Sequence, residues 1–232
     1  MNILCTICGR KGSKGIPNKN LNLFLKRPLA WHTMNQAKKS KIFTNIVVSS
    51  DSKKILELGK KLKLDLMIKR PNNLSTDNVP KLKVIKHAFI YSEKILKKKF
   101  DYVFDLDITA PLRTVSDIKN AYKKIKNKKN CNIISISPSK KNPFFNMVTL
   151  NKRSVKLVSN KTNQKFFSRQ KAPKSFDVDP SVNAWTRKSI LESNNIINKN
   201  TIYNIIPNNR AMDIDSKLDF KIVEFLYSMS NK

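Results

Sequence analysis

Short apolar runs alternate with longer amphipathic segments along most of the chain. The apolar runs have the length of buried strands: NILCTI (2–7), NIVVSS (45–50), LDLMI (64–68), YVFDLD (102–107) and NIISIS (132–137). Apolar residues recur with a period of about 3.6, as in an α-helix, over segments 28–40, 52–62, 79–98 and 114–127. This alternation predicts βαβ units and a mostly parallel sheet, so the expected fold class is α/β.

The alternation weakens from about residue 142 to residue 183. This segment begins with a pattern of two strands around a polar turn, and a loop is expected over 164–180. We expect one domain over 1–232, with 142–187 as an inserted element that serves as a lid or a subunit contact. The phenylalanine pairs at 144–145 and 166–167 favour subunit contact, and burial against their own domain is the alternative. An amphipathic helix is expected at 216–229.

The opening loop is a candidate phosphate site. In α/β sheets ligands bind beyond the carboxyl ends of the strands, and the first predicted strand runs into GRKGSKG at 9–15. Glycines let backbone N–H groups turn toward an anion, and Arg or Lys supplies charge. The loop fits neither G-x-x-x-x-G-K-[ST] nor G-x-G-x-x-G, so P-loop and dinucleotide-binding functions lose support. A solvated basic turn is the alternative.

Asp213 and Asp215 form a candidate metal site. On an extended segment, side chains at i and i+2 lie on one face, where two carboxylates can share a hard cation such as Mg²⁺. The alternative is that Asp215 caps the final helix. Acidic residues are scarce, with 16 Asp+Glu against 47 Lys+Arg, so a pair after an apolar run favours function. The loop and the pair together suggest a nucleoside triphosphate with Mg²⁺.

The formal net charge of +31 does not define a nucleic-acid site. The lysines are spread over the whole chain, and no basic arm, zinc-finger spacing or RNP-type motif focuses them. We therefore expect solvated surface charge, no specific nucleic-acid partner and a preference for anionic small molecules. Cys5 and Cys8 form a C-x-x-C, but the sequence has no second Cys or His pair at the spacing of metal ligands. We therefore expect both to be buried thiols in a strand. No apolar run is long enough for a membrane span, so a soluble, cytoplasmic protein without a membrane partner is expected.

The stretch GRKGSKGIPNKN at 9–20 resembles the N-terminal signature of the CMP-sialic acid synthetases (acylneuraminate cytidylyltransferases), approximately R-x-x-S-K-G-[IL]-P-x-K-N. Further elements similar to that family follow in the same order: VSSDS (48–52), KRP (69–71), LSTD (74–77), TAPLR (109–113), SRQ (168–170) and DIDSKLDF (213–220). The resemblance covers essentially the whole chain. It implies a Rossmann-like sheet of the nucleotide-diphospho-sugar transferase type with an inserted dimerisation element, acting as a homodimer.

The resemblance also implies an activity and residue roles. The family joins CTP to a nine-carbon 2-keto sugar acid with Mg²⁺ and releases pyrophosphate. The implied triphosphate ligands are Arg10, Ser13, Lys14 and Lys19, and Asn20 and Arg70 are the implied cytidine ligands, with Asp107 and Thr109 also at the nucleotide. The implied metal ligands are Asp213 and Asp215, and the implied sugar contacts are Asp107, Arg169, Gln170 and Asn183. Arg10, Lys14, Lys19 and Asp215 are expected to be catalytic, and Arg169 and Gln170 to reach a neighbouring subunit's site.

The chain departs from the family where substrate choice is made. Asp107 stands where neuraminate enzymes commonly have the Gln of Q-P-T-S-P-L-R, and a carboxylate cannot donate as an amide can. This change resembles the branch acting on analogues such as legionaminic acid more than the N-acetylneuraminate branch. The family's N-G-x-I-Y is altered at 183–187, where Trp185 packs on a sugar or in the interior. The alternatives are a Kdo-activating cytidylyltransferase and a non-catalytic binder of nucleic acid or anionic glycan. His32 and His87 receive no catalytic role.

Overall fold

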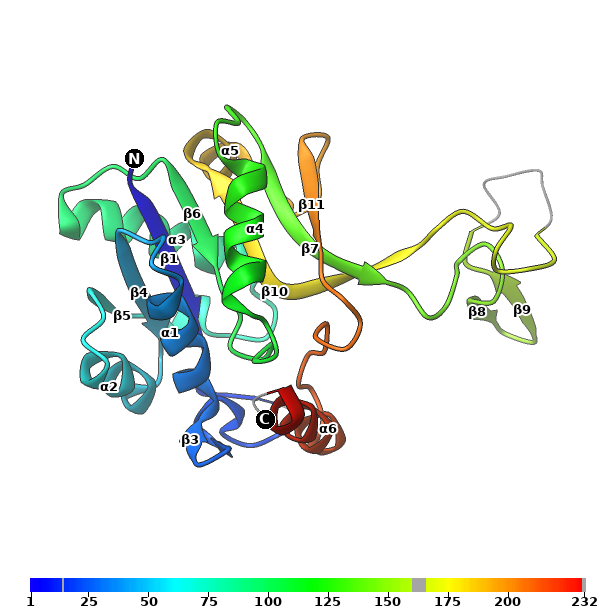
Figure 1. Cartoon of the computed structure of the whole chain (residues 1–232), viewed down its shortest axis with the longest axis horizontal. Coiled ribbons are helices and arrows are strands. Elements are labelled where there is room, and N and C mark those ends of the chain that lie inside the picture. Colours follow the sequence, from blue (N-terminus) through cyan, green and yellow to red (C-terminus); the bar gives the residue numbers. More distant parts are fainter. Residues whose placement is uncertain (14, 160–165, 231–232) are drawn as a thin grey trace.

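The computed structural model describes residues 1–13, 15–159 and 166–230, and its centre is a seven-stranded sheet (Figure 1). The sheet has the strand order β11-β7-β10-β6-β1-β4-β5. Its strands are β1 (Ile3–Cys8), β4 (Asn45–Ser50), β5 (Leu66–Lys69), β6 (Tyr102–Asp105), β7 (Asn132–Pro138), β10 (Phe176–Thr186) and β11 (Thr201–Ile205). The smaller pairs are β2 (Leu23–Phe24) with β3 (Arg27–Pro28), and β8 (Val148–Asn151) with β9 (Ser154–Leu157). The helices are α1 (Leu29–Ser40), α2 (Lys53–Lys61), α3 (Lys81–Leu96), α4 (Val115–Ile125), α5 (Arg187–Glu192) and α6 (Lys217–Ser230).

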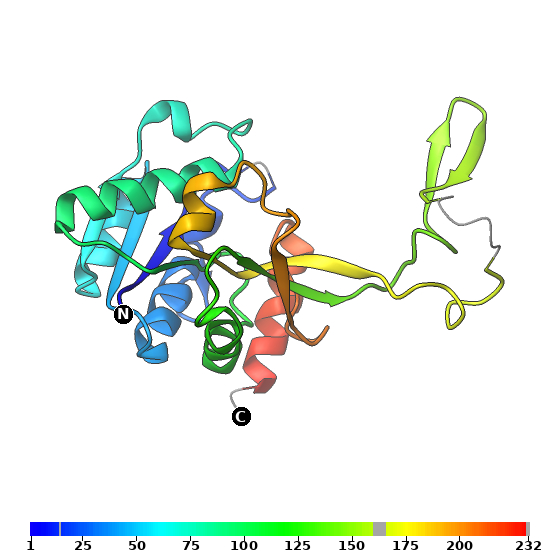
Figure 2. The same ribbon diagram turned by 90° about the horizontal axis from the view of Figure 1, so that it is seen from above.

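Helices cover both faces of the sheet, as the predicted βαβ pattern requires. Alternate residues of a strand face opposite sides, so Ile3, Cys5 and Ile7 of β1 pack into one core with apolar residues of α1, α2, α4 and α6. Leu4 of the same strand packs into the second core with residues of α3 and α5. The result is a three-layer α/β fold, which confirms the predicted fold class (Figure 2).

The sheet is mostly parallel, with one antiparallel strand in its interior. β1 pairs in parallel with β4 and β6, and β7 pairs in parallel with β11. The antiparallel strand β10 lies between β6 and β7. The sequence pattern assigned 164–180 to a loop, and this was wrong for residues 176–180, which belong to β10. Polar residues interrupt this strand at Asp177, Asp179 and Ser181, so no apolar run marks it.

A narrow arm projects from the body between β7 and β10 (Figures 1 and 2). It carries the β8–β9 hairpin expected from the sequence, whose residues are all exposed on both faces. Phe144 packs against Phe166 within the arm, whereas Phe167 is 85% exposed. Of the predicted insertion at 142–187, residues 176–186 belong to the main sheet, so the projecting part is the shorter stretch before β10.

The three cysteines are free thiols in or next to strands of the sheet. Cys5 and Cys8 lie in β1, and Cys131 lies directly before β7. Burial raises the pKa of all three thiols, which keeps them protonated at neutral pH. Cys5 is therefore a buried thiol in a strand, as predicted, whereas Cys8, at the end of β1, is only partly buried. None of the described helices is long and apolar enough to cross a membrane.

Candidate active site

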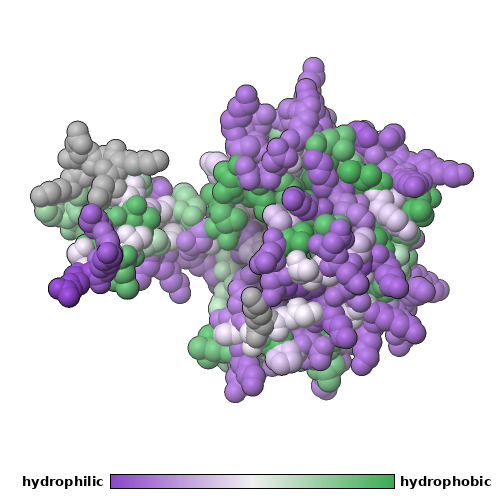
Figure 3. Space-filling view, turned by 180° about the vertical axis from the view of Figure 1, so that it is seen from behind, coloured by the Kyte–Doolittle hydropathy of each residue, from purple (hydrophilic) through white to green (hydrophobic). Residues whose placement is uncertain are grey.

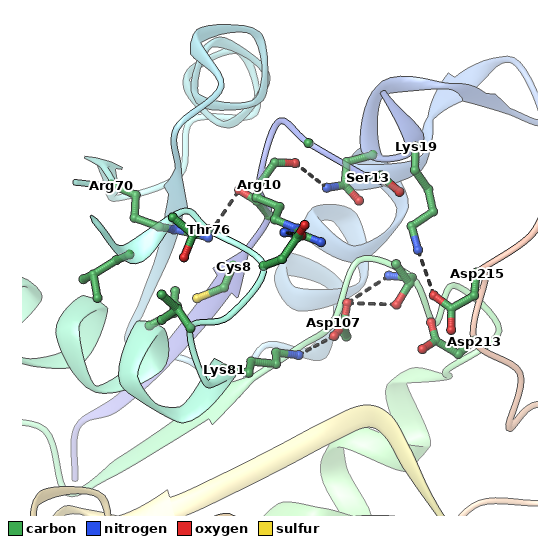
Figure 4. Close-up of a pocket in the computed structure, with 18 residues that line it drawn as sticks. Cys8, Arg10, Ser13, Lys19, Arg70, Thr76, Lys81, Asp107, Asp213 and Asp215 are labelled. Carbon is green, nitrogen blue, oxygen red and sulfur yellow. Dashed lines mark hydrogen bonds and ion pairs between the residues drawn. The ribbon is translucent and has the colours of Figure 1, made fainter. Parts of the chain in front are cut away.

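A cavity of about 330 Å³ opens at the carboxyl ends of β1 and β6 (Figure 4). The parallel sheet brings the ends of these neighbouring strands together with the end of β5, so residues far apart in the sequence line one space. The predicted site residues in its wall are Arg10, Ser13, Lys19, Asn20, Arg70, Asp107, Thr109, Asp213 and Asp215. Lys14 lies outside the described residues. The resemblance therefore named residues that the fold gathers in one place.

The loop after β1 is held in place by side chains behind it. Arg70 is buried and donates to the carbonyl oxygens of Gly9, at 3.2 Å, and Ser49, at 2.6 Å. Asn20 donates to the carbonyl of Arg10 at 3.0 Å. Asn20 thus contacts the loop itself, and Arg70 joins the loop to the end of β4. The Arg10 guanidinium forms an ion pair with Asp77 across the cavity, so the loop is tied to the segment after β5.

Asp213 and Asp215 lie together on the opposite wall. They flank Ile214, which is buried and whose N–H donates to the carbonyl of Thr109 at 3.0 Å, so both carboxylates lie beside the cavity. Asp215 accepts from Lys19 Nζ at 3.1 Å, and its side chain is 78% exposed. Gly15 sits against the Asp215 carbonyl, where a Cβ would collide with that oxygen. The loop and the acidic pair therefore touch directly.

The electrostatics of Asp213 point to a ligand. Burial is the main cause that raises its pKa from 3.8 to about 6, and the nearby charges of Asp107 and Asp215 act in the same direction. Its Oδ1 atom is buried without a hydrogen-bond partner among the described residues. A partly buried carboxylate with one buried, unpaired oxygen fits a hard cation. No group of three or more His, Cys, Asp or Glu in the described part of the chain could hold a metal alone. A cation here would thus need further oxygen ligands, such as those of phosphates.

The alternative that Asp215 caps the final helix is not what the structure has. Ser216 takes that position, because its hydroxyl accepts from the N–H of Asp219 at 3.1 Å. The Asp219 carboxylate accepts in turn from the N–H groups of Ser216 and Asp215. This reciprocal arrangement satisfies the start of α6 without the Asp215 side chain. The Asp215 carboxylate is left to face the cavity and Lys19.

Asp107 and Thr109 form the wall next to the acidic pair. Asp107 accepts from the Thr109 N–H at 3.1 Å and from its hydroxyl at 3.0 Å, and it pairs with Lys81. Burial alone would raise the pKa of Asp107, but the Lys81 charge and these hydrogen bonds lower it to about 2. Asp107 is therefore a fixed anion at neutral pH. Lys81, Thr76, Asp77 and Val79 also line the cavity and were not assigned from the sequence.

Three residues assigned to the sugar lie outside the cavity wall. Arg169 and Gln170 are exposed residues of the arm, and Arg169 donates to the carbonyl of Ser139 in the same arm. Asn183 lies on β10 opposite Asp105 of β6, and its Oδ1 atom is buried without a described partner. Trp185 is fully buried in the second core, so it packs in the interior and contacts no substrate. His32 bonds to the Phe24 carbonyl.

The fold is that of nucleotidyltransferases. A solved structure of CMP-2-keto-3-deoxy-manno-octonic acid synthetase complexed with CTP superimposes with a TM-score of 0.73 at 11% identity, over 99% of this chain and 100% of that one. A 4-diphosphocytidyl-2C-methyl-D-erythritol synthase follows with a TM-score of 0.68 at 7% identity, over 97% of this chain and 99% of the other. At these identities the likeness concerns the fold alone.

The sequence then places the chain more narrowly. The family model described as Cytidylyltransferase matches residues 4–213, and the chain belongs to this nucleotidyltransferase family. It is 41% identical to a CMP-N,N'-diacetyllegionaminic acid synthase of Campylobacter jejuni, over 99% of this chain and 96% of the relative. It is 38% identical to a post-translational flagellin modification protein B of Campylobacter coli, over the same shares of the two chains.

Proposed function

We propose that this chain couples CTP to the anomeric hydroxyl of a nine-carbon sialic-acid-like sugar acid of the legionaminate type, giving the CMP-sugar and pyrophosphate. One observation carries the proposal: Arg10, Ser13 and Lys19 share a single cavity with the carboxylate pair Asp213 and Asp215. Cations and carboxylates in one wall suit a nucleoside triphosphate with a divalent ion. The 41% identity to a legionaminate-activating relative supports the sugar class.

The reaction asks this site chiefly for positioning and charge. A hydroxyl must approach the α-phosphorus in line with the departing pyrophosphate, and the polyanion repels it until cations neutralise the phosphates. Arg10 and Lys19 supply positive charge, and the Ser13 hydroxyl supplies a hydrogen bond. Arg70 and Asn20 hold the loop so that these groups stay together. No covalent enzyme intermediate is required.

Mg²⁺ fits the acidic pair. The unpaired Oδ1 of Asp213 and the exposed Asp215 side chain would hold it, and phosphate oxygens would complete the set. When bound, the ion supplies charge neutralisation and Lewis-acid polarisation of phosphoryl oxygens. Lys19 already contacts Asp215, so it fixes that carboxylate beside the phosphate groups.

A test of the proposed function measures pyrophosphate release with CTP, Mg²⁺ and a sugar acid. N,N'-diacetyllegionaminate, pseudaminate, N-acetylneuraminate and Kdo are compared side by side, with each nucleoside triphosphate in turn. We expect release with CTP and the highest kcat/KM with the legionaminate. A higher kcat/KM with Kdo would show that the substrate is an eight-carbon sugar acid. If no sugar acid gives pyrophosphate release and the protein binds RNA in a salt-dependent way, the non-catalytic alternative would be supported.

We infer further that two copies of the chain pair through their arms. An isolated two-stranded hairpin is marginally stable in water, and this one exposes Val148, Leu150 and Val155 by 53%, 84% and 62%. Figure 3 shows apolar residues on the surface of the arm, interspersed with polar ones. Burial of the arm against a second copy would remove that surface from water. It would also bring Arg169 and Gln170 toward the partner's cavity.

Replacing Leu150 with Lys is expected to break this dimer. A lysine at the most exposed apolar position of the hairpin would carry a charge into the buried contact. Light scattering after gel filtration should give the monomer mass for Leu150→Lys and twice that mass for the unmodified protein. Thr149→Lys, on the same strand, is the matched control, because it places the same charge on the opposite face of the hairpin, where it replaces a polar side chain. A monomeric unmodified protein would contradict the pairing.

A further inference from the structure

Lys81 enters the cavity as part of a charge cluster that no motif marked. It is the first residue of α3, and its side chain points toward Asp107 in the cavity wall (Figure 4). Its ammonium lies 2.9 Å from Asp105 Oδ2 and also pairs with Asp107. Asp105 is completely buried, whereas the Asp107 side chain is 17% exposed at the cavity. One cation thus joins a buried carboxylate to one that faces the substrate space.

The two carboxylates have different surroundings. Asp105 accepts from the Thr6 hydroxyl at 2.9 Å inside the sheet. Asp107 is held by the N–H and hydroxyl of Thr109 together with Lys81. Every described contact of Asp107 therefore comes from a donor, which fixes the orientation of an ionised carboxylate. One cation and two anions leave the cluster with a net negative charge. Asp107 is the carboxylate of the cluster that is exposed at the cavity.

A carboxylate in this state can only accept hydrogen bonds. An amide at the same position could also donate, and could turn to present either end. With Asp107 fixed as an acceptor, a substrate group at this point of the wall must be a hydroxyl or an amide N–H. A carboxylate oxygen there would meet like charge, and a carbonyl oxygen would face another acceptor; either costs more than a missed contact.

We propose that Lys81 is a specificity-determining positioning residue, which acts by holding Asp107 as an acceptor-only group for a hydroxyl or amide N–H of the sugar acid. This inference rests on the proposed function. Lys81 touches no reacting atom in this account, because it works through Asp107. The competing explanation is purely structural, in which Lys81 serves only to neutralise the buried Asp105.

A pair of substitutions separates these explanations. Lys81→Met alone leaves Asp105 buried without its cation, so this variant is expected to lose thermal stability. Adding Asp105→Asn removes the buried charge and keeps an oxygen that can accept from Thr6. The double variant Lys81→Met/Asp105→Asn has the same net cluster charge as the unmodified protein. It should therefore regain the melting temperature but still lack the group that holds Asp107.

The decisive measurement is steady-state kinetics of that double variant with each sugar acid. We expect its KM for the preferred sugar acid to rise at least about tenfold, the size of a lost charged hydrogen bond. Its KM for CTP should change less than about threefold, since Lys81 contacts none of Arg10, Ser13 and Lys19. The ratio of its kcat/KM for the preferred sugar acid to its kcat/KM for the other sugar acids should become smaller. Lys83→Met, an exposed lysine of the same helix, is the matched control.

A third substitution tests the route through Asp107. If Lys81 acts by holding Asp107, its loss should matter little once Asp107 has been replaced. The triple variant, with Asp107→Asn added to the double variant, should then have nearly the same KM for the sugar acid as the single variant Asp107→Asn. Full kinetic recovery in the double variant would overturn the proposal and leave Lys81 a structural role. Independent, multiplying effects would overturn the route through Asp107. An unmodified protein that activates no sugar acid would instead contradict the proposed function.

Discussion

Asp213→Asn is expected to remove most turnover while making the metal-free protein more stable at pH 8. The folded-state pKa of about 6 exceeds the ordinary 3.8, so the ionised carboxylate destabilises the fold above pH 6. That cost shrinks as the pH falls through 6 and vanishes below 3.8. An amide carries no charge, so it removes the cost, and we expect a rise in melting temperature of about 2–6 °C at pH 8 and none at pH 4.

The same change removes a metal ligand, because an amide is a weaker ligand for Mg²⁺ than a carboxylate. Pyrophosphate release should fall at least about a hundredfold, the loss typical of a missing electrostatic group. Mg²⁺ with CTP should raise the melting temperature of the unmodified protein but not of Asp213→Asn. Asp215→Ala should likewise remove most turnover and leave the fold intact. Glu57→Gln, an exposed acid on α2, is the control, and full activity in both aspartate variants would refute the metal assignment.

The sequence predicted which strand ends bring the candidate site residues together. The apolar runs at 2–7 and 102–107 end within two residues of the observed strand ends, Cys8 and Asp105, and parallel pairing then brings the loops that follow them together. The resemblance added identities that geometry alone could not supply, such as Lys19, which reaches Asp215 across nearly two hundred positions (|i−j| = 196). The local pattern and the motif order thus pointed to the same loops.

The parts that were missed depend on tertiary contacts. β10 begins with alternating polar and apolar residues, and its first three residues are exposed. Its interior position in the sheet is set by pairing with β6 and β7, which are distant in sequence. Lys81 looked like one of many lysines at the start of a helix. Its ion pairs with Asp105 and Asp107 appear only when the start of α3 packs beside the carboxyl ends of the strands. In a chain with 47 Lys+Arg, nothing local separates this lysine from solvated ones.

Replacing Arg113 with Met is expected to cause the largest loss of stability in the body of the protein. Arg113 closes the motif at 109–113, and only 1% of it is exposed. It donates to the Thr33 hydroxyl and the Gln36 side-chain carbonyl, each at 3.0 Å, and to the backbone carbonyls of Asp107 and Ser181. It thus fastens α1, β10 and the Asp107 loop together. Burial lowers its pKa to about 10, so it stays charged at neutral pH.

The expected loss of stability for Arg113→Met follows from the buried hydrogen-bond acceptors that are left without a donor. Methionine fills much of the space but donates nothing, so several buried acceptors lose their partner at once. Removing one member of a buried charged network costs about 3–5 kcal/mol, or about 6–20 °C in melting temperature for a chain of this size. Arg113→Lys should recover only part of this, because a single ammonium cannot reach acceptors on several sides. Arg27→Met, at an exposed arginine, should shift the melting temperature by about 1 °C or less. Because the Asp107 backbone is one of the acceptors, Arg113→Lys should also raise the KM for the sugar acid, and an unchanged KM would show that the loop holds its position without this residue.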